Sequence, residues 1–124
     1  YAEGLRNLDI RPNSSVVIVT RGHREDDRAL EAAVRSPAGY VGLVGSRRKT
    51  ILIYEELLKN GIALDRLRAV HAPVGLDIGA KTPEEIAVSI VADIVAFREG
   101  HAGKSMTMDN KYLSKLAQKV ATPA

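Results

Sequence analysis

One stretch, residues 40–60, constrains the fold more than any other, because its hydrophobic pattern changes from that of a strand to that of a helix within a few residues. Its first part is apolar without alternation, which is typical of a strand covered on both faces in a parallel sheet. From Ser46 onward, Ile51, Tyr54, Leu57 and Leu58 fall on one helical face, and Asn60 and Gly61 end the pattern. The stretch therefore predicts a strand at 40–44, a tight turn and a helix at 47–60.

The turn between these two elements has the composition of an anion site. Ser46 is a natural N-cap, and backbone N–H groups at a helix N-terminus favour negative charge. Arg47, Arg48 and Lys49 follow at once, although cations in a first turn oppose the helix dipole. The sequence therefore predicts that Gly45, Ser46, Arg47 and Arg48 bind a phosphate-sized anion. The alternative is that these basic side chains extend into water or pair with carboxylates on neighbouring loops.

A second candidate segment follows an earlier strand. The run at 16–19 is β-branched throughout, as expected for a buried strand, and it leads into the polar residues 20–26. If the two strands are parallel, their carboxyl ends lie at the same edge of the sheet, where ligands bind in open α/β folds. Thr20 and His23 are therefore candidate ligand-binding residues beside the turn.

The role of His23 admits several interpretations. It could donate a proton to a ligand, or bind a metal with Asp26 and Asp27, although the spacing matches no established metal pattern. The more ordinary interpretation treats it as a polar turn residue, with Asp26 as the N-cap of a helix predicted at 27–36.

The segment after Gly61 supplies a third group of candidates. A short helix fits residues 62–67, and a short strand is predicted at 69–71, ending in His71. The following loop, residues 72–80, is too rich in Gly and Pro to be regular and too apolar to lie freely in water. Gly75 would let its backbone approach a ligand closely, and Asp77 could accept a hydrogen bond from one. An Asx turn, or a pair with Arg47 or Arg48, explains Asp77 equally well.

The last part of the chain contains the clearest helix signal. Thr82, Pro83 and Glu85 have the spacing of an N-cap, a first helical residue and a capping box, which predicts a helix at 83–99. Its apolar residues predict that a wide face packs on the sheet: Ile86, Ala87, Ile90, Val91, Ile94 and Val95. The tail, residues 101–124, predicts one amphipathic helix through Tyr112, Leu113, Leu116 and Val120.

Composition narrows the class of protein. A length of 124 residues suits one domain, and the absence of Cys excludes disulfides and thiolate metal sites within the chain and suits a cytoplasmic protein. No apolar run approaches the roughly 20 residues that a membrane span needs. The net charge of +3 comes from residues 98–124, and with few aromatic residues the chain predicts no general binding of nucleic acid.

Three blocks of sequence together resemble the C-terminal Rossmann-like domain of the XdhC/CoxI family, the xanthine dehydrogenase accessory factors. The blocks are VVIVTRGHREDDRALEAAV, YVGLVGSRRK and HAPVGLDIGAKTPEEIAVSIVADIVAFREG. The resemblance covers about residues 14–100 and implies an α/β, three-layer, Rossmann-like parallel sheet. A domain is thus expected at 1–100. The cysteine-bearing N-terminal domain and the first strand with its glycine-rich turn do not precede Val16, so the C-terminal half of the fold is expected.

The resemblance also implies a function. Such a factor binds molybdenum cofactor, supports its sulfuration by a cysteine desulfurase, and hands it to the apo-enzyme of a molybdenum hydroxylase, without turnover of its own. Molybdopterin, or its dinucleotide form, ends in phosphate groups, which agrees with an anion site at the turn before Arg47. The cofactor-binding residues expected on both grounds are Gly45, Ser46, Arg47, Arg48, Thr20, His23, His71, Gly75 and Asp77.

Two functions of other classes stay open. An NAD(P)-dependent oxidoreductase domain would need a G-x-G-x-x-G turn and an acidic residue for the ribose, and neither is found. A structural half-domain would complete the sheet of a partner without a ligand of its own. Because so short a sheet exposes an edge and apolar surface, a homodimer or a complex with a companion N-terminal chain is expected.

Overall fold

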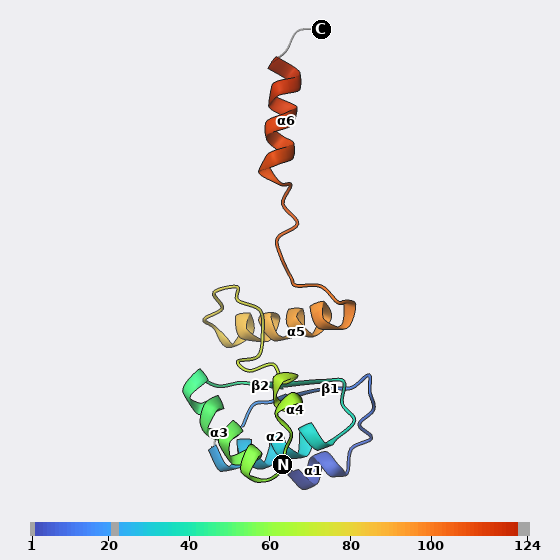
Figure 1. The fold of residues 1–124 in the computed structure, drawn as a ribbon, viewed down its shortest axis with the longest axis vertical. Helices are drawn as coiled ribbons and strands as arrows, with labels where there is room; N and C mark the ends of the chain where they lie inside the picture. Colours follow the sequence, from blue (N-terminus) through green and yellow to red (C-terminus); the bar gives the residue numbers. More distant parts are fainter. Residues whose placement is uncertain (1, 21–22, 122–124) are drawn as a thin grey trace.

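The computed structural model describes residues 2–20 and 23–121, without the side chains of Ala2, His23 and Arg24. The elements follow the order α1 (Ala2–Arg6), β1 (Ser15–Ile18), α2 (His23–Arg35), β2 (Tyr40–Leu43), α3 (Arg47–Lys59), α4 (Leu64–Arg68), α5 (Pro83–Glu99) and α6 (Asn110–Ala121). Figure 1 shows α1, α2 and α3 on one face of the strands and α5 on the other. The expected three-layer α/β arrangement is therefore confirmed.

The sheet is parallel, as predicted. Ser15 of β1 lies opposite Tyr40 of β2, and Ile18 lies opposite Leu43. The third strand predicted at 69–71 is wrong as a strand, because only His71 forms a bridge, with Gly42. Helix α4 occupies the chain up to Arg68, and Pro73 lacks the N–H that a continuing ladder needs. Hydrogen bonds from the His71 amide to the Val41 carbonyl and from the Leu43 amide to the His71 carbonyl still hold this segment beside β2.

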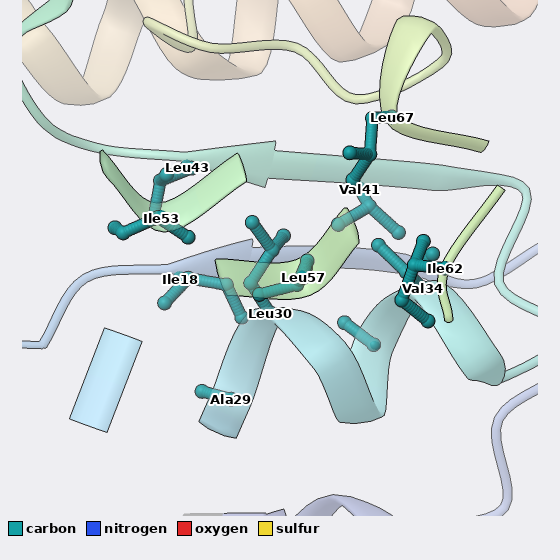
Figure 2. Packing of buried hydrophobic residues seen from close by; sticks show 11 residues of the cluster. Ile18, Ala29, Leu30, Val34, Val41, Leu43, Ile53, Leu57, Ile62 and Leu67 are labelled. Carbon is teal, nitrogen blue, oxygen red and sulfur yellow. The ribbon is translucent and has the colours of Figure 1, made fainter. Parts of the chain in front are cut away.

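Strand β2 is buried on both faces, as its unbroken apolar run predicts. Val41 and Leu43 point toward α2 and α3, where they join the core with Leu30 and Leu57 (Figure 2). Tyr40 lies on the opposite face, where its hydroxyl reaches α5. The alternation along β2 thus divides the strand between an apolar core and a more polar contact with α5.

Helix α2 begins earlier than predicted. It starts at His23 and not at residue 27, so Asp26 lies within the first turn and is not the N-cap. The Asp26 side chain is fully buried and bonds to Thr20 and Lys49. The capping interpretation of Asp26 was therefore wrong, because a long-range ionic partner, and not the local helix end, holds this carboxylate.

Helix α5 has the predicted ends but not the predicted orientation. Thr82 and Glu85 form the full capping box, and Gly100 closes the helix in the left-handed conformation. The residues that it buries are Ser89, Asp93 and Ala96. Of the predicted packing face, Ile90 and Ile94 are half-buried, whereas Val91 and Val95 are exposed. The Ser89 hydroxyl donates to the Leu76 carbonyl at 2.6 Å, and Asp93 accepts from Tyr40. The buried face of this helix therefore carries two hydrogen-bonding side chains beside its apolar ones.

The capping box makes the stability of α5 depend on pH. The backbone amides of Thr82 and Lys81 donate to Glu85 at 3.0 and 2.9 Å and lower the pKa of its carboxyl below the ordinary value. The stabilisation is complete above the ordinary pKa of glutamate and is lost as the pH falls through the lowered folded-state pKa. We expect acidification below about pH 4 to lower the Tm of Glu85→Gln by less than it lowers the Tm of the wild type.

The control for this comparison is Glu84→Gln, which removes the neighbouring carboxylate of the same turn. Thermal unfolding followed by circular dichroism at a series of pH values should give the wild-type acid sensitivity for Glu84→Gln. Equal acid sensitivity of Glu85→Gln and the wild type would contradict the capping role.

The tail forms the predicted helix without docking. Helix α6 is exposed along its whole length and stands away from the rest of the chain in Figure 1. The segment before it has no regular structure, and Gly103 packs against the Leu76 side chain closely enough that an added Cβ would lie 2.6 Å from Leu76 Cδ1. The chain thus leaves the body of the fold near Leu76.

Candidate functional site

The turn after β2 has the geometry of an anion site. The Lys49 amide donates to the Ser46 side-chain oxygen at 3.2 Å, which confirms Ser46 as the N-cap of α3. The Thr50 hydroxyl donates to the Ser46 carbonyl at 2.9 Å and fixes the turn from the other side. Within the described part of the chain, the backbone amides of residues 45–48 meet no acceptor. They are available to a ligand.

The side chains that open the helix carry positive charge into solvent. Arg47 and Arg48 are exposed, and neither guanidinium has an ion-pair partner among residues 2–20 and 23–121. No acidic residue lies in the first turn of α3. Two uncompensated cations therefore lie beside the free amides, and this arrangement suits the oxygens of a phosphate group.

Lys49 differs from its two neighbours. It turns back toward the protein and forms an ion pair with the fully buried Asp26, which also accepts a hydrogen bond from the Thr20 hydroxyl. Its aliphatic stem passes Gly45, where an added Cβ would lie 3.3 Å from Lys49 Cδ. For Lys49 the alternative interpretation, a pair with a carboxylate of a neighbouring segment, is therefore the one that the structure shows.

The structure brings the two predicted segments together at one edge. The parallel register places Ile18 beside Leu43, so the chain that leaves each strand enters the same region. There Thr20, Asp26 and Lys49 link the end of β1, the first turn of α2 and the first turn of α3. The side chain of His23 lies outside the described residues. This edge of the sheet thus combines a buried ion pair, Asp26 with Lys49, and the exposed side chains of Arg47 and Arg48.

His71 lies in a different environment, on the α5 side of the sheet. Its Nδ1 is 2.9 Å from Asp93 Oδ2, and the Tyr40 hydroxyl donates to the same oxygen at 2.6 Å. The imidazole lies 4.3 Å from the Tyr40 ring and 5.0 Å from the Phe97 ring, measured between centroids. Burial and the neighbouring Asp93 carboxylate raise the pKa of the Tyr40 hydroxyl, which therefore stays a donor. The side chains of Tyr40, His71 and Asp93 thus hold α5 against β2.

Asp93 is the residue that sequence reasoning missed. It stands within an apolar helical pattern, 22 residues after His71 and 53 after Tyr40, so no local spacing connects it to either partner. The only sequence signal is an acidic residue inside an otherwise apolar stretch, which is expensive to bury without partners.

Gly75 and Asp77 lie in the loop before α5. Gly75 has φ +107°, and an added Cβ would lie 2.4 Å from the Ser89 hydroxyl, so the close approach that glycine permits is to α5. Asp77 is exposed and has no ion pair within the described ranges. The loop thus packs on α5, and no hydrogen bond or ion pair of the described residues joins it to the turn at Ser46. The described residues also include no cluster of three or more His, Cys, Asp or Glu that could hold a metal ion.

Comparison with known proteins identifies the family. Residues 2–94 match the XdhC Rossmann domain. The chain belongs to this family. The matched range of the XdhC domain includes both segments of the candidate anion site and Asp93, and it stops before α6.

Relatives of this XdhC domain agree with the match. The Escherichia coli protein YqeB is 38% identical over 106 residues, and a protein of Bacillus subtilis named as a probable xanthine dehydrogenase component is 34% identical over 95 residues. These alignments cover 86% and 77% of the chain. A crystal structure of a xanthine dehydrogenase from Bacillus halodurans superposes on 80% of it, with a TM-score of 0.64 and 35% identity.

These relatives are much longer than the chain. It spans 19% of the Escherichia coli protein, 27% of the Bacillus subtilis protein and 28% of the Bacillus halodurans chain. No helix in the described part of the XdhC domain has the length and apolar character needed to cross a membrane.

Proposed function

We propose that this XdhC domain binds molybdenum cofactor through a terminal phosphate at the N-terminus of α3, as part of a maturation factor for a xanthine dehydrogenase type hydroxylase. The observation that carries the proposal is that the Arg47 and Arg48 guanidinium groups, and the backbone amides of residues 45–48 beside them, meet no partner among the described residues. The family of the chain and the names of two relatives supply the link to xanthine dehydrogenase.

The residues at the turn fit the phosphate end of the cofactor. Backbone amides and a helix N-terminus bind phosphate oxygens, and arginine can bind two of them at once. Ser46 holds its oxygen on the Lys49 amide, so its hydroxyl proton can be donated to an anion. The cofactor, when bound, would carry the molybdenum chemistry that the hydroxylase uses. The role of this chain is to hold the phosphate and to present the remainder of the molecule.

A role in delivery fits the side chains better than catalysis does. Ser46 serves as an N-cap, Lys49 neutralises Asp26, and the His71 imidazole is packed between Tyr40 and Phe97. The Thr20 hydroxyl donates to Asp26, but that carboxylate is fully buried and paired with Lys49, so the contact serves the packing of the edge. The partners that follow are the apo-hydroxylase, which receives the cofactor, and a cysteine desulfurase, which sulfurates it.

A binding titration tests the anion site. We expect Arg47→Ala with Arg48→Ala to weaken the binding of molybdopterin, or of its dinucleotide form, by at least about tenfold, because charge-assisted hydrogen bonds contribute roughly 1.5–3 kcal/mol each. The matched control is Lys59→Ala with Arg68→Ala, which removes the same charge at exposed positions outside the turn. Equal affinities of the two double variants would reject the site.

A transfer assay tests the function itself. The chain, supplemented with the front part of a full-length relative, should accelerate activation of a cofactor-free hydroxylase by molybdenum cofactor. Tight binding of NAD(P) with hydride transfer, and no effect on the hydroxylase, would replace this proposal by an oxidoreductase domain.

The two-stranded sheet favours one alternative function. A sheet of two strands is marginal in water, and β1 has no second neighbour among the described strands. A domain that only completed the sheet of a companion chain would bind that chain equally well with Arg47 and Arg48 replaced, and would not bind the cofactor. The titration and the transfer assay separate this alternative from delivery.

A further inference from the structure

The outward face of α5 is apolar, although it points away from the sheet. Val88, Val91 and Val95 follow one another at spacings of three and four residues, and their exposed fractions are 61%, 59% and 41%. They lie opposite the face that carries Ser89 and Asp93 into the fold. A solvent-facing helix side is normally polar, so this seam of valines is expected to be covered by another apolar surface.

Helix α6 carries a second exposed row of apolar residues with the same spacing. Leu113, Leu116 and Val120 recur at three and four residues, and Tyr112 widens the face. Met108, Tyr112, Leu116 and two lysines line a shallow surface hollow along this face. The chain thus presents two helices with matching apolar seams, and no described contact covers either seam.

The charges of the two helices are complementary. Helix α6 carries Lys111, Lys115 and Lys119 and no acidic residue. The exposed charges of α5 are three glutamates, Glu84, Glu85 and Glu99, and one arginine, Arg98. Two copies of α5 placed against each other would bring like charges together, whereas α6 against α5 pairs lysines with glutamates.

The lengths also agree. Helix α6 spans roughly 18 Å and α5 roughly 25 Å at 1.5 Å per residue, so α6 can lie along α5 without overhang. Residues 104–109 connect the contact between Gly103 and Leu76 to α6, and such a segment reaches at most about 20 Å. In the structure this segment carries α6 away from its own α5 (Figure 1).

We infer that α6 of one copy docks on the outward face of α5 of a second copy, and that the exchange is reciprocal in a twofold dimer. Each contact buries the valines of one α5 against Leu113, Leu116 and Val120 of the other copy's α6. The twofold axis generates this contact twice. The dimer does not involve the turn at Ser46, so it does not depend on the proposed cofactor.

Light scattering with two point variants gives the first test. The wild-type chain should have twice the mass of one chain at tens of micromolar. Leu116→Glu should raise the dissociation constant of the dimer at least about tenfold, because it places a charge at the centre of the apolar contact. Ser114→Glu adds the same charge to the opposite side of α6 and should leave the dimer intact. A monomeric wild type, or a Leu116→Glu variant that remains dimeric, would overturn the inference.

Cross-linking identifies which helices meet. The chain has no cysteine, so Val91→Cys and Leu116→Cys each create one reactive thiol. When the two variants are mixed and treated with a short bis-maleimide, the main product should join Val91→Cys to Leu116→Cys. Mixing Val91→Cys with Ser114→Cys is the control and should give little product.

Each alternative arrangement leaves a different product. Docking of α6 on its own α5 gives no cross-link between the two mixed chains. Direct pairing of two α5 helices gives a product that contains Val91→Cys alone. Either result would overturn the proposed exchange of α6.

Discussion

Asp93→Ala is expected to lower the free energy of unfolding by about 3 kcal/mol, because the Tyr40 hydroxyl and the His71 imidazole would both lose their acceptor. Asp93 is nearly buried, and it accepts from Tyr40 at 2.6 Å and lies 2.9 Å from His71 Nδ1. The cavity left by the smaller side chain adds to the loss. Urea unfolding followed by circular dichroism measures the change.

Two further variants make this result interpretable. Tyr40→Phe keeps the ring and removes one of the two donors, so the expected loss is about 1 kcal/mol, which stays measurable if Asp93→Ala does not fold. Asp77→Ala removes an exposed aspartate and should change stability by less than about 0.5 kcal/mol. If Asp93→Ala were as stable as Asp77→Ala, the carboxylate would not be what holds α5 on the sheet.

Lys49→Met is expected to lower the free energy of unfolding by about 2–3 kcal/mol, because it leaves the buried Asp26 carboxylate without its cation. Asp26 is fully buried, whereas the Lys49 side chain is 27% exposed, so water replaces part of the lost interaction. We therefore place the effect slightly below the roughly 3–5 kcal/mol that a fully buried broken ion pair costs. Chemical denaturation gives the value directly.

The double variant Asp26→Asn with Lys49→Met separates charge from packing. Asparagine still accepts from the Thr20 hydroxyl but carries no charge, so more than half of the lost stability should return. Lys59→Met changes an exposed lysine at the other end of α3 and should have almost no effect. A double variant no more stable than Lys49→Met would show that the ion pair is not the cause.

The sequence predicted the elements whose determinants are local. Ser46 and Thr82 cap the helices that follow them, because an N-cap needs only an amide three residues away. The strands at Val16 and Val41 were recognisable from unbroken apolar runs, and a buried parallel sheet requires such runs. The three layers were expected from the resemblance to the XdhC/CoxI family.

The features that the sequence did not predict depend on distant partners. The orientation of α5 follows from Asp93 bonding to Tyr40, 53 residues away, while the helical pattern alone favoured its apolar side. Asp26 had the local features of a cap, but Lys49 holds it inside the first turn of α2. For the candidate site, the capped turn at Ser46 was predicted, whereas the pairing of Lys49 with Asp26, 23 residues earlier in the chain, was not.

The aromatic contact between β2 and α5 provides a spectroscopic signal that belongs to one interface. Phe97 is the only phenylalanine and the chain has no tryptophan, and the Phe97 ring meets those of His71 and Tyr40 edge-on at 5.0 and 5.6 Å. Ring currents in such a group shift the proton resonances of all three rings. In a one-dimensional NMR spectrum, detachment of α5 would remove these shifts, whereas an anion bound at Ser46 would leave them unchanged.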